Sequence, residues 1–177
     1  MNQTQLSPLI WKYGLTGGLV SSLVFLIFTI TGLAKPGSNM AGMAMGFLNL
    51  AVLIALVVVA VRKHRDEMQE GFISLGQCML LGMGIIMLSA LIAGLVSLIY
   101  TQFIDPGYMD RIMAGMEEAW EAQGLDEDQI EKAKEMTSIM KSPMLSMAAN
   151  LACYGIGGAI ISLIVGLIMK NEKPEFS

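Results

Sequence analysis

The chain has 177 residues, of which 54% are hydrophobic and 15% are charged, and its mean hydropathy is +0.61. This composition is too apolar for a soluble globular domain of that length, so we expect an integral membrane protein in contact with the lipid bilayer. The net charge of −4 and the scattered placement of the 11 Lys and Arg residues exclude the clustered basic surface needed to bind nucleic acid.

The N-terminal third predicts two membrane spans joined by a short turn. An uncharged run predicts a first span over residues 13–34, because it is longer than the apolar core of a cleaved signal peptide, which is the alternative. Pro36, with Gly and Ser after it, predicts a turn, and a second span follows over residues 40–61. A basic loop begins at Arg62, and His64 is expected to be solvated among its cations.

The third predicted span is the longest apolar stretch of the chain. Residues 71–104 contain no Asp, Glu, Lys or Arg. As a helix this stretch would be roughly 50 Å long, which exceeds the hydrocarbon core of a bilayer. We therefore predict that a helix over 71–103 spans the membrane and protrudes from it.

A helical hairpin is predicted after the third span, over residues 105–141. Asp105 and Pro106 are typical of an N-cap and a first helical residue, and Gly124 is expected to end that helix. Asp126 with Gln129 predicts a capping box for a second helix. The segment holds ten acidic and four basic residues, so it is expected to lie outside the membrane. Its apolar stripe is the candidate partner face, which includes Met113, Met116 and Trp120.

Residues 144–169 complete an all-α fold of four transmembrane helices in a single domain, residues 1–177. Cations near span ends favour the cytoplasmic side. With both termini in the cytoplasm, six cations lie inside, close to the spans, and five lie outside, mostly spread through the acidic segment. We therefore expect a multi-pass protein of the bacterial inner membrane, with cytoplasmic termini and an extracytoplasmic hairpin.

Small residues recur at four-residue spacing in the first and fourth spans. Such residues let helix backbones approach closely in lipid, where packing replaces the hydrophobic effect between helices. The contact could lie within the chain or between copies. The candidate helix-packing residues are Gly14, Gly18, Ser22, Gly158, Ser162 and Gly166.

Amide side chains within the spans are candidate intramembrane polar contacts, because an unpaired amide in hydrocarbon is costly. Asn49 and Asn150 are each expected about two turns from the outer surface, so we predict a hydrogen bond between them across the second and fourth spans. Contacts of this kind join helices more often than they bind solutes. The candidates are Asn49, Gln77 and Asn150.

Motifs for metals or catalysis are weak. The 16 methionines could offer thioether ligands to Cu(I), but a methionine stripe at helical spacing is more simply a buried face. Cys78 and Cys153 lack metal-ligand spacing and fall in apolar spans. Ser138 and Lys141 match an SxxK pattern without its companion motifs. We expect no metal site, no cofactor and no catalytic residue.

Two short motifs carry a family resemblance. Gly71 and Phe72 open the third span with Gln77 six residues after the glycine, and Asp105-Pro106 with Tyr108 opens the acidic segment. With the order of spans and loops, these motifs resemble the bacterial membrane family called domain of unknown function 4199, over residues 9–169. The resemblance implies a four-span membrane protein with no established activity.

The sequence favours a protein that acts through self-association or through a membrane or extracytoplasmic protein partner, because the apolar stripe of the hairpin must pack on something. The alternative is a small oligomeric channel or carrier for a neutral solute, lined by Asn49, Gln77, Ser89 and Asn150. Proton-coupled transport is disfavoured because the predicted spans contain no Asp, Glu, Lys, Arg or His. An enzyme is the least favoured class.

Overall fold

The computed structural model describes residues 6–33, 39–137 and 142–171. Four helices within these ranges are long and apolar enough to cross a membrane. They are α1 (Leu6–Ile30), α2 (Asn39–Lys63), α3 (Leu75–Ile99) and α6 (Pro143–Met169). Short π-helical turns, η2 (His64–Met68) and η3 (Tyr100–Ile104), continue α2 and α3, and two shorter helices, α4 (Tyr108–Ala122) and α5 (Glu127–Thr137), lie between α3 and α6.

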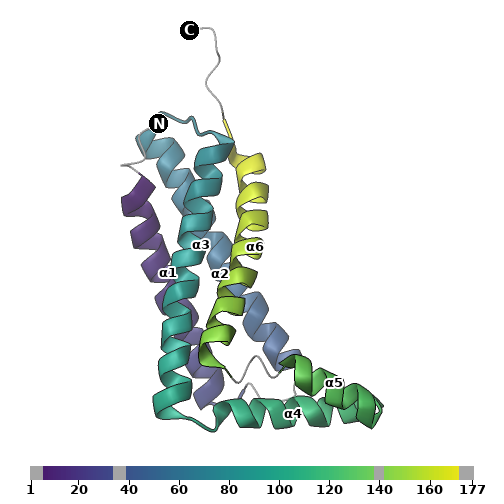
Figure 1. Ribbon diagram of the computed structural model, residues 1–177. Helices are drawn as coiled ribbons and strands as arrows, with labels where there is room; N and C mark the ends of the chain where they lie inside the picture. The colour runs from purple at the N-terminus through teal and green to yellow at the C-terminus, as the bar shows by residue number, and fades with distance from the viewer. Residues whose placement is uncertain (1–5, 34–38, 138–141, 172–177) are drawn as a thin grey trace.

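The bundle is built around α3, which makes most of its helix contacts with α1 and α6. The start of α1, the connection from α2 to α3 and the end of α6 lie together at one end of the bundle, which we call the terminal end. Helices α4 and α5 lie at the opposite end, where α4 runs across the long helices and α5 lies beside the bundle (Figure 1). We call this the α4 end.

Apolar side chains cover the outside of the long helices. On α1 they recur every four residues, with exposed fractions between 44% and 59% at Leu15, Leu19, Leu23 and Ile27. Only 22–33% of the residues in the most apolar window of each long helix are buried inside the protein. Side chains of this kind are stable against lipid and not against water. The chain is therefore a multi-pass membrane protein.

The small residues of α1 and α6 lie against α3. A Cβ atom at Gly18 would come within 2.6 Å of Ile92 Cβ, so only glycine permits this approach. A Cβ atom at Gly166 would lie 2.8 Å from Leu75 Cδ1 and 3.1 Å from Cys78 Cβ, which marks a second close approach. Ser22 and Ser162 are buried on the same helix faces as these glycines. All six residues with the predicted spacing thus take part in packing within the chain: Gly14, Gly18, Ser22, Gly158, Ser162 and Gly166.

The third span begins later than predicted, at Leu75 and not at residue 71. Gly71 has a positive φ of 89°, which breaks the helix, and Ile73 forms an antiparallel bridge with Asn171, with N···O distances of 2.8 and 3.0 Å. Ser74 is the N-cap of α3, and its hydroxyl accepts a hydrogen bond from the Gln77 backbone N–H while the Gln77 side chain accepts one from the Ser74 N–H. Gln77 therefore caps α3 at the terminal end, and its polar contacts are with Ser74 of the same helix start.

Other boundaries also differ from the sequence pattern. Helix α1 begins at Leu6, because the polar leader contains enough apolar residues to continue the helical face, and Leu6 and Leu9 are buried. The N-cap of α4 is Gly107 and not Asp105, since residues 105–108 form a turn closed by the Tyr108 N–H and the Asp105 carbonyl. The predicted capping box of Asp126 and Gln129 is present before α5. Pro36, Ser138 and Lys141 lie outside the described residues.

Candidate functional site: a polar cavity beneath α4

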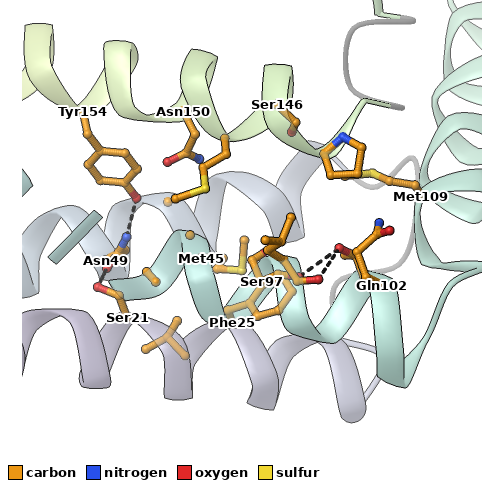
Figure 2. Close-up of a pocket in the computed structure, with 18 of the residues that line it drawn as sticks. Ser21, Phe25, Met45, Asn49, Ser97, Gln102, Met109, Ser146, Asn150 and Tyr154 are labelled. Carbon is orange, nitrogen blue, oxygen red and sulfur yellow. Dashed lines mark hydrogen bonds between the residues drawn. The ribbon is translucent and has the colours of Figure 1, made fainter. Parts of the chain in front are cut away.

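A cavity of about 420 Å³ lies at the α4 end of the bundle. Residues from all four long helices line it, and Pro106, Met109 and Asp110, from the connection to α4 and its first turn, lie across its end. Figure 2 shows the side chains of α6 facing those of α1, α2 and α3 across this space. The volume falls within the range of about 300–1,000 Å³ that is usual for small-molecule sites.

A chain of hydrogen bonds links three of the long helices at the inner end of the cavity. The Ser21 hydroxyl of α1 donates to Asn49 Oδ1 of α2 at 2.6 Å, and Asn49 Nδ2 donates to the Tyr154 hydroxyl of α6 at 2.8 Å (Figure 2). Polar groups at membrane depth must find partners within the protein, because lipid offers none. The network satisfies both ends of the Asn49 amide.

The predicted hydrogen bond between Asn49 and Asn150 is wrong, because Asn49 has other partners. Both residues line the cavity, but Asn49 bonds Ser21 and Tyr154. Tyr154 lies one helical turn after Asn150 on the same face of α6, and its longer side chain reaches Asn49. One feature of the sequence could have indicated this partner: a tyrosine lies four residues after the asparagine in an apolar span.

Asn150 and Ser146 extend from α6 into the same space, opposite Met45 and Ser97 (Figure 2). Asn150 is exposed, so its amide is accessible to a molecule in the cavity. Among the described residues that line the cavity, Asp110 is the only one with a charged side chain. The described part of the lining thus offers mainly hydroxyl and amide groups.

Helix α4 is held over the cavity by three aromatic rings. Phe25 of α1, Tyr100 of η3 and Tyr108 of α4 contact one another edge to face, with centroid distances of 5.6, 6.1 and 5.8 Å. Next to them Arg111 donates a hydrogen bond to the Asp105 carboxylate, which raises the pKa of Arg111. These contacts tie the start of α4 to α1 and α3.

Several residues singled out in the sequence lie elsewhere. Ser89 is buried, and its hydroxyl donates to the carbonyls of Gly14 and Ile85 at 3.0 and 2.8 Å, so it does not line the predicted solute path. Gln77 lies at the terminal end. The candidate partner face on α4, which consists of Met113, Met116 and Trp120, is half-buried.

His64 is fully buried, so the expectation of a solvated side chain is wrong. It is the first residue of the π-helical turn that follows α2, and the wider turn changes which side chain faces inward. Neither ring nitrogen has a hydrogen-bond partner within the described residues. Cys78 is buried and Cys153 exposed, and no group of His, Cys, Asp and Glu in the described part of the chain has the geometry to hold a metal ion.

Comparison with known proteins yields a single assignment. No curated protein and no solved structure matches the chain. One family model, described as "Protein of unknown function (DUF4199)", matches residues 12–171. That range covers all four long helices except the first two turns of α1, together with α4 and α5. The chain therefore belongs to the DUF4199 family of proteins of unknown function.

Proposed function

We propose that this protein is a non-catalytic membrane protein that binds a small neutral polar group in the cavity beneath α4. The observation that carries the proposal is the lining itself: uncharged hydroxyl and amide groups from all four spans converge on about 420 Å³ of space. A bundle that only needed stability would fill that space with apolar side chains, because packing at close to crystal density is the rule in protein interiors. Open space with aligned polar groups is typical of a binding site.

The chemistry of the lining favours binding over catalysis. Its polar side chains are hydroxyls and amides around one carboxylate, that of Asp110, which itself has a partner within the chain. Acid–base and nucleophilic mechanisms need a nucleophile with a base held within hydrogen-bond reach, and the described lining residues include no His, Lys or Cys. The proposal therefore includes no cofactor and no reaction.

We place the protein in a bacterial inner membrane with both termini in the cytoplasm and the cavity open to the outer side. The basic loop after α2 and the end of α6 lie together at the terminal end, which is the side that the distribution of cations favours for the cytoplasm. The acidic segment of α4 and α5 then lies outside the membrane. Its carboxylates are mostly exposed, in agreement with a solvated surface.

A carrier of neutral solutes remains the nearest alternative. Between the cavity and the terminal end the bundle is filled by fully buried apolar side chains, among them Val57, Val61 and Leu81. A solute in the cavity therefore has no passage through this conformation, and transport would require a second state or an oligomer. The cavity is better explained as a one-sided binding site.

Association with a second copy or with another membrane protein is the second candidate. Helices α4 and α5 extend beyond one side of the bundle (Figure 1), and the half-buried stripe of Met113, Met116 and Trp120 leaves part of its surface accessible. A partner on this face would lie next to the cavity roof. Binding in the cavity and binding on α4 can be separated by substitution.

The test is native mass spectrometry of the protein purified from its own membranes in mild detergent. We expect a neutral organic molecule retained at one per chain, lost in Asn150→Leu and kept in Ala149→Leu, whose altered residue is exposed but does not line the cavity. Replacing Met113, Met116 and Trp120 with polar residues should leave retention unchanged. Recovery of bulk membrane lipids alone, in the same proportions for all variants, would contradict the proposal.

A further inference from the structure

A second hollow of about 300 Å³ adjoins the cavity on the side of the bundle, between α2 and α6. Gly46, Asn49 and Tyr154 line both spaces, so the hydrogen bond between Asn49 and Tyr154 lies where they meet. Beyond this junction the lining is almost entirely apolar. It includes Leu50 and Leu53 of α2, Ile86 of α3 and Ile161 of α6. We call this hollow the α2–α6 groove.

We propose, on the basis of the binding function above, that the ligand is a neutral amphiphile. Its hydroxyl-bearing headgroup occupies the cavity beneath α4, and its hydrocarbon chain lies in the α2–α6 groove. A small polar solute would use the first space and leave the second empty. A molecule with both a polar head and an apolar chain uses the two adjoining spaces together.

The groove owes its depth to two glycines. A Cβ atom at Gly46 of α2 or at Gly157 of α6 would have no heavy atom within 4 Å, so neither glycine is there to allow close helix packing. Gly158, one residue further, differs, because its Cβ would lie 3.0 Å from Ile86 Cγ2. One face of α6 is thus packed against α3, and the adjacent face leaves room for a ligand.

The depth of the groove in the membrane determines what fills it. Its lining residues fall within the candidate spans Gly42–Met68, Leu75–Ile104 and Pro143–Met169, so the open side faces hydrocarbon. Water there would find almost no hydrogen-bond partners, whereas an alkyl chain would gain contacts on both sides. The groove therefore binds a hydrocarbon chain.

The cavity lining selects among membrane amphiphiles. The described lining residues include no Lys, Arg or His that could pair with an anionic phospholipid headgroup. A glycerol-like headgroup instead matches the amide of Asn150 and the hydroxyls of Ser97 and Ser146. We therefore assign the site to neutral amphiphiles of the monoacylglycerol type, and ordinary phospholipid is the competing occupant.

The experiment uses the full-length protein in nanodiscs and two photoreactive monoacylglycerols. One carries a diazirine in the middle of its chain and the other carries it on the glycerol headgroup. We expect the chain probe to label groove residues in α2 and α6 more than the lipid-facing side of α1, in a saturable manner. The headgroup probe should label the cavity. Unlabelled monoacylglycerol should compete with both probes, and an anionic lysophospholipid should compete with neither.

Variants separate the groove from the cavity. Gly157→Leu places a side chain in the groove from a position where its Cβ meets no heavy atom within 4 Å, and it should reduce saturable chain labelling by about tenfold. Gly42→Leu is the matched control, since it adds the same side chain to open space on α2 outside both hollows and should leave labelling unchanged. If Gly157→Leu does not fold, the labelled peptides of the unmodified protein still show whether the chain probe lies in the groove.

The outcomes distinguish the two proposals. Saturable headgroup labelling in the cavity, with chain labelling spread evenly over all lipid-facing helices, would overturn the amphiphile and leave the binding function intact. Absence of saturable labelling with either probe, or equal competition by the anionic lipid, would overturn the assignment to a neutral amphiphile. In that case the mass spectrometry experiment decides the binding function: retention of another neutral molecule would support it, and retention of bulk lipid alone would contradict it.

Discussion

Asn49 shows how a single amide organises the membrane interior of this protein. Its carbonyl oxygen accepts from Ser21 and its NH₂ group donates to Tyr154, so one side chain joins α1, α2 and α6. Helix α2 makes fewer contacts with the bundle than α1 and α6 do, although Val57 and Val61 near its C-terminal end are fully buried. The two hydrogen bonds therefore fix the part of α2 that forms the wall of the cavity.

We expect the hydrogen bond between Asn49 and Tyr154 to appear as a coupling energy. In a double-mutant cycle of Asn49→Leu and Tyr154→Phe, measured by reversible unfolding in mixed micelles, the coupling should be about 0.5–1.5 kcal/mol, which is typical of polar contacts between membrane helices. Tyr13→Phe, near the terminal end of α1, is the control, and its change in the free energy of unfolding should simply add to that of Asn49→Leu. Additive behaviour in the Tyr154 cycle would show that the contact contributes nothing.

Individual residues were only partly predictable from the sequence. The cost of burying amides in lipid identified Asn49 and Asn150, and both line the cavity. Their partners could not be predicted, because helix rotation and side-chain length decide which polar atoms meet, and Tyr154 reaches further than Asn150. The burial of His64 depends on a π-helical turn that residue spacing does not reveal.

At the scale of elements, α4 covers part of the cavity, because Met109 and Asp110 of its first turn contribute to the lining. Its first turn is attached by the rings of Phe25, Tyr100 and Tyr108, while the rest of the helix contacts mainly α5. The Lys134 ammonium of α5 also pairs with the Glu117 carboxylate of α4, outside the bundle. The position of the roof therefore depends on a few contacts at one end of the helix.

Removal of the Tyr108 ring should loosen α4. Edge-to-face contacts contribute about 0.5–1.5 kcal/mol each, so Tyr108→Ala, which loses two of them, should speed hydrogen exchange of the first α4 amides by about tenfold or more. Phe103→Ala removes a ring that is 81% exposed at the same corner and should have little effect. If both variants exchange at the rate of the unmodified protein, the aromatic cluster does not hold the roof.

Boundaries of elements followed the sequence where a local signal was strong. The capping box of Asp126 and Gln129 was confirmed before α5. The start of α3 was not predicted, because the span was defined only by the absence of charged residues. In the structure a bridge between Ile73 and Asn171 and a capping box at Ser74 precede the helix. Asp105 and Pro106 formed a turn before α4 in place of the predicted cap.

The whole molecule is a four-span membrane protein whose central helix packs on α1 and α6 and whose second helix stands further apart. Length and hydropathy were sufficient to predict the four spans, since few structures other than apolar helices are stable in lipid. The cavity and the α2–α6 groove were not predictable. They arise because α1 and α6 approach α3 closely at small residues, whereas α2 makes fewer contacts with α3 and leaves space at the α4 end. One sequence does not reveal such relative positions of helices.

The most direct test of this architecture is cysteine accessibility in intact membranes. In a Cys78→Ala, Cys153→Ala background, a membrane-impermeant cationic thiol reagent added from outside should label Ser97→Cys and Ser146→Cys, because both positions line the cavity. Gln123→Cys, at the exposed end of α4, should also be labelled, and the lipid-facing Leu19→Cys should not. Labelling of Gln123→Cys with no labelling of either serine position would contradict an open polar cavity at the α4 end. Labelling of all three from the cytoplasmic side alone would contradict the orientation.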